Sequence, residues 1–193
     1  MNADRFNDST YLIRRKVFKI FGGAFHIYNS ENQLVLFSNM KALKLKEDIR
    51  IYADEHMQEE IIKISTKAVI DFSATYHVYI SATGELMGSF RRKGLKSILK
   101  DEWLIFDKNG NEIGLIQEDS TFKAIVRRVL TNLVPQRFDC YIRDNLVCTY
   151  KQNFNPFVHK LIVDFTHDKE NLFDRRLGLA AGVLLNAIES RQS

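Results

Sequence analysis

Short runs in which apolar and polar residues alternate follow one another along most of the chain, and a polar turn separates each pair of runs. Alternation with a period of two is typical of strands that bury one face. The unit of strand, turn and strand recurs about every 25 to 35 residues, the range of repeated supersecondary units. Its copies are Phe25 to Phe37, Ile49 to Ile64, Tyr76 to Phe90, Trp103 to Ile116 and Phe138 to Tyr150. Their turns are rich in Asn, Asp, Ser and Gly, so each copy predicts an antiparallel hairpin. With Tyr11 to Ile20 and Val158 to Phe165, the sequence predicts about 12 strands.

A helical spacing replaces this alternation between Phe122 and Leu133. The apolar residues there fall on one face of a helix, with Ser120 or Thr121 as the cap and Pro135 as the stop. Arg127 and Arg128 fall on or near the polar side. This pattern predicts one amphipathic helix that covers one end of the sheet.

The segment from Leu177 to Ile188 is apolar on every side of a helical wheel and is interrupted only by Asn186. A helix of this kind has no face to expose to water, and its 12 residues fall short of the roughly 20 that a bilayer span needs. The sequence therefore predicts a mainly β fold, an antiparallel barrel of hairpin repeats that surrounds this helix. Small residues in the helix, Gly178 to Gly182 apart from Leu179, are expected where strand side chains press close. The competing arrangement is a helix on an open sheet, covered by a second subunit.

The composition favours a single domain over residues 1–193, because no Pro-rich, Gly-rich or Ser-rich linker divides the chain. No secretion signal is readable at the amino terminus, and the two cysteines, Cys140 and Cys148, are expected to be reduced and packed. We therefore expect a soluble, cytoplasmic protein that associates at most peripherally with a membrane.

The charged residues, 28 basic and 24 acidic, give a net charge of +4 that leans towards anionic partners. The stretch from Leu86 to Lys100 holds no acid and concentrates five cations, namely Arg91, Arg92, Lys93, Lys96 and Lys100. With Arg127 and Arg128 these residues form the candidate site for anionic phospholipid or for a phosphorylated small ligand. A solvated loop that keeps the barrel rim in water is the alternative. Further basic sets lie at Arg14 to Lys16 and at Lys41, Lys44 and Lys46.

No motif of a catalytic, metal or cofactor site is present, so we assign no catalytic residue, no metal ligand and no cofactor. His159, Asp164, His167 and Asp168 could converge near a strand end, but strand pairing or surface positions are favoured for them. Nucleic acid is disfavoured as a partner because the spacings of the common binding modules are missing.

The sequence resembles the tubby C-terminal-like superfamily, and within it the LURP-one-related proteins and the phospholipid scramblases. The resemblance is carried by Tyr11, Arg14 to Phe18, Phe25 to Tyr28, Ser89 to Leu95, Asp101 to Trp103, Ile162 to Phe165 and Asp174 to Glu189. It implies a β-barrel around a hydrophobic C-terminal helix. Tubby domains bind phosphoinositide head groups through basic surface residues, and scramblases are associated with membranes, lipid exchange and calcium. The proline-rich and cysteine-rich segments of the scramblases are absent from this chain.

These observations favour a non-catalytic binding module whose basic surface binds anionic phospholipid or phosphorylated head groups. A protein-interaction or scaffold domain is one alternative, and an exposed apolar patch or sheet edge would favour it. An enzyme with an active site at the barrel end, built from residues distant in sequence, is the other.

Overall fold

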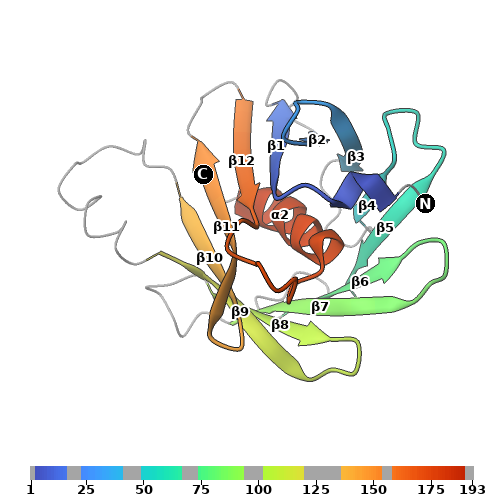
Figure 1. The fold of residues 1–193 in the computed structure, drawn as a ribbon. Helices are drawn as coiled ribbons and strands as arrows, with labels where there is room; N and C mark the ends of the chain where they lie inside the picture. The colour runs from blue at the N-terminus through green and yellow to red at the C-terminus, as the bar shows by residue number, and fades with distance from the viewer. Residues whose placement is uncertain are drawn as a thin grey trace.

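A computed structural model describes residues 3–16, 23–40, 49–66, 74–93, 102–119, 136–153 and 158–189. These residues form a closed barrel of twelve antiparallel strands around one helix, α2, as Figure 1 shows. The strands are β1 (Thr10–Lys16), β2 (Gly23–Tyr28), β3 (Leu34–Met40), β4 (Ile49–Tyr52), β5 (Glu60–Ser65), β6 (Thr75–Ile80), β7 (Leu86–Arg92), β8 (Glu102–Asp107), β9 (Glu112–Glu118), β10 (Arg137–Ile142), β11 (Asn145–Asn153) and β12 (Val158–Asp164). A short 3₁₀ helix, η1 (Ala3–Phe6), precedes them, and α2 (Arg175–Glu189) follows them. The predicted fold class is confirmed.

Each strand pairs with its neighbours in sequence, and β1 closes the ring against β12, with Ile13 opposite Leu161. The five predicted hairpins correspond to β2–β3, β4–β5, β6–β7, β8–β9 and β10–β11. In every one of them the register shifts just before the turn, at Ile27/Tyr28, Ile51/Tyr52, Val78/Tyr79, Ile105/Phe106 and Cys140/Tyr141. An aromatic residue follows the shift each time. Since bulges bend and twist a strand, their repetition at one position suits a sheet that curls into a barrel.

The turns use the backbone conformations that their residues tolerate. Asn32, Gly84 and Gly110 have positive φ, as do the adjacent Arg143 and Asp144 in the two-residue turn between β10 and β11. Two successive positive φ values define a type I′ turn, whose twist matches that of the strands it joins. The hairpins thus follow from local sequence.

Helix α2 lies inside the barrel, and its residues from Leu177 to Ala187 are buried. Asp174 caps its start, where the Oδ1 atom accepts a hydrogen bond from the amide of Arg176 at 2.8 Å. A Cβ atom added at Gly178 would lie 2.5 Å from the Phe165 ring, and one at Gly182 would lie 2.9 Å from Ile13. The prediction that small residues admit close strand side chains is therefore confirmed for both glycines.

The enclosed helix is also held by a hydrogen bond from the barrel wall. Tyr150, which is fully buried on β11, donates from its hydroxyl to the carbonyl oxygen of Gly178 at 3.0 Å. Its strand neighbour Cys148 and the facing Cys140 complete the wall beside α2 as buried free thiols. The second predicted helix, from Phe122 to Leu133, falls outside the described residues. No helix within the described ranges is long and apolar enough to cross a membrane.

Candidate anion-binding surface

The antiparallel order gives the barrel two distinct ends. At one end, which we call the hairpin end, lie the turns of the five hairpins, η1 and the connection from β12 to α2. At the other, which we call the loop end, β1, β3, β5, β7, β9 and β11 finish. Helix α2 starts at the hairpin end, where Gly178 meets Phe165, and runs towards the loop end.

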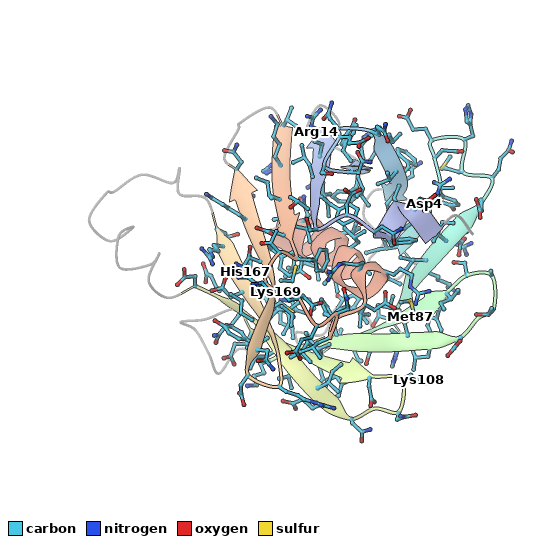
Figure 2. The ribbon with its side chains drawn as sticks, viewed as in Figure 1. Asp4, Arg14, Met87, Lys108, His167 and Lys169 are labelled. Atoms are coloured by element: carbon cyan, nitrogen blue, oxygen red, sulfur yellow. The ribbon has the colours of Figure 1, made fainter. Side chains whose placement is uncertain are left out.

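Charge is divided unequally between these ends when each charged residue is assigned to the nearer one. The described residues of the hairpin end include 15 Asp and Glu against 6 Lys and Arg. Those of the loop end include 11 Lys and Arg against 5 Asp and Glu. Figure 2 shows one member of each group, Arg14 near the tip of β1 and Lys108 in the β8–β9 turn. Among the described residues, the hairpin end therefore has a net charge of −9 (6 − 15) and the loop end a net charge of +6 (11 − 5).

The first three cations of the predicted cluster lie at the loop end, where β7 finishes. Arg91 is exposed on the outer wall, and its guanidinium carbon lies 4.7 Å from the centre of the Phe106 ring on β8. Lys93 is also exposed, and its Nζ atom lies 3.1 Å from a carboxylate oxygen of Glu102. Arg92 is half-buried opposite Trp103 and points inward, because it shares its face with Gly88, which adjoins Leu177 of α2.

The aromatic contact changes what Arg91 can do. A guanidinium above a ring keeps its N–H groups available at the edge while the ring limits the side chain to few conformations. Arg91 therefore loses less conformational entropy when it binds an anion than an arginine without such a contact would lose. The other predicted site residues, Lys96, Lys100, Arg127 and Arg128, fall outside the described residues.

A second group of cations becomes visible only from the strand register. Arg137 lies opposite Lys151, and Lys160 lies opposite Arg14. Since Lys151 faces Ile162, it is also a diagonal neighbour of Lys160. All four point outward, because the residues that alternate with them, such as Ile13 and Tyr150, face α2. We call this row across β10, β11, β12 and β1 the basic belt, formed by Arg137, Lys151, Lys160 and Arg14.

The belt places like charges directly opposite each other, which destabilises a sheet. Arg137 is compensated by Asp139, whose Oδ1 atom accepts a hydrogen bond from the Nε atom of Arg137 at 2.9 Å. Arg14 is held by the Tyr28 ring, 4.7 Å from its guanidinium carbon, and its Nη2 atom donates a hydrogen bond to Oδ1 of Asn32 in the β2–β3 turn at 3.3 Å, so its guanidinium leans away from the loop end. Lys151 and Lys160 form no ion pair within the part of the chain that the structure describes. Apart from Arg14, which lies in the basic set Arg14 to Lys16, the belt was not predicted from the sequence, because its members come from four separate segments.

Inward-facing polar residues lie behind the belt at the same end. Arg15 lies opposite His159, with its guanidinium carbon 5.9 Å from the Phe25 ring centre, and His159 Nδ1 lies 3.5 Å from Gln152 Nε2. Burial, and then the positive charge of Arg15, lower the pKa of His159. The lowered pKa favours the neutral imidazole, so the cationic character of this group comes from Arg15.

The hairpin end carries a buried carboxylate with a structural task. Asp168 accepts hydrogen bonds from the amides of Leu172 and Phe173 at 2.8 and 3.1 Å, and from Arg175 Nη1 at 2.8 Å. Arg175 also lies over the Phe165 ring, 4.5 Å from its centre. These contacts fix the connection that leads into α2.

The set considered for metal binding does not converge. His159 lies at the loop end of β12, whereas His167 is exposed beyond the hairpin end of that strand. The neighbouring Asp168 already accepts a hydrogen bond from Arg175. Within the described ranges, no three His, Cys, Asp or Glu side chains are grouped closely enough to hold a metal ion.

The two cysteines face each other across β10 and β11, as the hairpin prediction implied. Burial raises the pKa of both thiols, Cys140 and Cys148, well above the ordinary value. A thiolate is the reactive form of cysteine, so both behave as packed apolar groups at neutral pH.

A closed twelve-stranded barrel around a hydrophobic helix defines a structural class, and the sequence comparison identifies the family within it. Residues 34–170, more than two thirds of the chain, match the sequence model of the LURP-one-related family. The chain therefore belongs to this family, which is related to the tubby-like proteins. No curated protein and no solved structure matches the chain.

Proposed function

We propose that this protein is a non-catalytic binding module that binds anionic phospholipid head groups at the loop end of its barrel. The observation that carries the proposal is the excess of cations there, 11 Lys and Arg against 5 Asp and Glu among the described residues. Arg91 on β7 and Lys93, which directly follows β7, are exposed members of this group. Membership of a family related to the tubby-like proteins supports the same kind of ligand.

The magnitude of the expected effect is large enough to measure. Each Lys or Arg close to an anionic bilayer surface contributes on the order of 1 kcal/mol to binding. The ion pair between Lys93 and Glu102 competes only weakly, since the Lys93 side chain is 47% exposed and exposed pairs are worth little. A surface with several such residues binds anionic vesicles measurably at low salt.

Co-sedimentation with vesicles tests the proposal. The protein is expected to sediment with phosphatidylcholine vesicles that contain phosphatidylserine or a phosphoinositide, and to stay in solution with phosphatidylcholine alone. Raising the salt concentration should release it, because salt screens exposed charges. Replacing Arg91 and Lys93 together, as Arg91→Glu and Lys93→Glu, should strongly reduce the difference between the two vesicle types.

A soluble inositol phosphate added as a competitor shows whether the protein recognises a single head group or the charged bilayer surface. Release of the protein from vesicles at low competitor concentration indicates recognition of one head group, whereas indifference to it indicates attraction to the charged surface. Equal recovery of the parent protein on neutral and anionic vesicles would refute the proposal.

The scaffold alternative loses its simplest mode of binding in this fold. The twelve described strands form a closed barrel, which leaves no sheet edge among them for an added strand. Among the described residues, the exposed large hydrophobic side chains are Met57, Ile162 and Leu172. They lie on different elements, at the β4–β5 turn, on β12 and before α2.

A further inference from the structure

We propose that the basic belt is a second contact with the same membrane, so that the barrel stands with its loop end on the anionic surface and its hairpin end directed away. The inference rests on the proposed function and adds to it the residues Lys151 and Lys160 and the orientation of the molecule. The partner is an anionic lipid surface rather than a single head group.

The basic belt and β7 lie well apart in the ring of strands. In the order of the closed barrel, β1 lies six strands from β7 and β10 lies three from it. The belt and the pair Arg91 and Lys93 therefore occupy different sides of one rim. With neighbouring strands about 4.8 Å apart, a ring of twelve strands is roughly 20 Å wide. One head group is too small to reach both, whereas a flat surface laid against the loop end meets both at once.

The unbalanced charge within the belt carries the second step. Lys160 faces Arg14, and Lys151 faces Arg137, so each lysine opposes another cation across the sheet. Acidic partners are available to Arg137 through Asp139, but Lys151 and Lys160 have none among the described residues. A layer of lipid phosphates supplies the missing negative charge and relieves this repulsion.

The acidic hairpin end carries the third step. Its 15 Asp and Glu against 6 Lys and Arg are repelled by the surface that attracts the loop end. Attraction at one end and repulsion at the other select one orientation during approach, as charge complementarity does for other partners. A molecule lying on its side would bring acidic turns such as that of Asp107 against the membrane.

Two charge-matched double variants test the inference. Lys151→Gln with Lys160→Gln removes two positive charges from the belt, and Lys108→Gln with Lys169→Gln removes two from the hairpin end. Figure 2 shows Lys108 and Lys169. All four positions lie at or near the surface, and the belt variant also removes like-charge pairs, so both variants are expected to fold.

The partition coefficient onto phosphatidylserine-containing vesicles is the readout. One basic residue near the surface corresponds to roughly a fivefold change, so the belt variant should bind roughly thirtyfold more weakly. The hairpin-end variant should bind as tightly as the parent within about twofold. If the belt variant binds like the parent while Arg91→Glu with Lys93→Glu does not, the orientation is wrong and the proposed function stands. If the parent does not prefer anionic vesicles, both fail together.

Discussion

The two ends of the barrel are made of the same hairpins, yet they differ in what their polar residues do. At the hairpin end the polar side chains bond to the backbone and to each other. Asp168 holds two amides and Arg175, and Asp174 caps α2. At the loop end, Lys151 and Lys160 oppose other cations and form no ion pair in the described part of the chain. The comparison indicates that one end secures the enclosed helix and the other carries charge for a partner.

This division predicts that stability and binding respond to different substitutions. Changes around α2 and the hairpin end should lower the free energy of unfolding and leave the affinity of the folded protein for vesicles unchanged. Changes of the loop-end cations should lower the affinity for anionic vesicles and leave the free energy of unfolding nearly unchanged.

The largest loss of stability is expected from Leu184→Asp, in the middle of the enclosed helix. Leu184 is 1% exposed, so the variant buries a carboxylate with no partner, and the free energy of unfolding should fall by several kcal/mol. Leu184→Met, which conserves volume, should cost less than about 1.5 kcal/mol. Denaturant unfolding followed by circular dichroism gives both values. A Leu184→Asp variant as stable as the parent would contradict the enclosed helix.

A smaller but still substantial loss is expected from Asp168→Ala. The variant leaves Arg175 and two amides without their acceptor, and breaking a buried pair of this kind typically costs about 3 to 5 kcal/mol. Glu170→Ala, in the same connection but exposed, should change the free energy of unfolding by less than about 0.5 kcal/mol. Vesicle affinity should be unchanged in both variants under conditions where they are folded. A loss of affinity without a loss of stability would place Asp168 in the binding surface instead.

The smallest effect concerns the cap of α2 and appears only in acid. Burial alone would raise the pKa of Asp174, but hydrogen bonds from the Arg176 side chain and amide, with its charge, outweigh burial and lower the pKa below 3.8. The carboxylate therefore stabilises the folded state above about pH 3.8, and this contribution is lost as the pH falls through the lowered folded-state pKa.

Asp174→Asn keeps a residue that can cap the helix but removes the titration. The parent should exceed this variant in unfolding free energy by less than about 1 kcal/mol at neutral pH, and the difference should shrink in acid. Thermal unfolding measured between pH 3 and pH 7, as a series, checks this. A difference that stays constant with pH would show that the charge of Asp174 does not contribute to the free energy of unfolding.

Much of the fold could be predicted from the sequence, because its signals are local. The hairpins from Phe25 to Tyr150 follow from alternation and turn residues, and the enclosed helix follows from Leu177 to Ile188 being apolar on all sides. The pairing of β1 with β12, which closes the barrel, joins segments distant in sequence. It could be predicted only because a helix that is apolar on all sides has to be enclosed.

The site could be predicted only in part. Arg91, Arg92 and Lys93 are adjacent in sequence, so their cluster is visible there, whereas the support of Arg91 by Phe106 depends on how β7 pairs with β8. The belt was not predicted, because Arg14 meets Lys160 only where the barrel closes. Likewise, the charge polarity appears only when each residue is assigned to an end of its strand.

A fluorescent dye placed at each end in turn tests the central claim that the loop end contacts the membrane and the hairpin end points away from it. Asn153→Cys at the loop end and Asn109→Cys in the β8–β9 turn provide exposed thiols, while the native Cys140 and Cys148 are too buried to be labelled. With an environment-sensitive fluorophore and anionic vesicles, emission should shift to shorter wavelength at position 153 and stay unchanged at position 109. A shift at position 109, or an equal shift at both, would contradict the account.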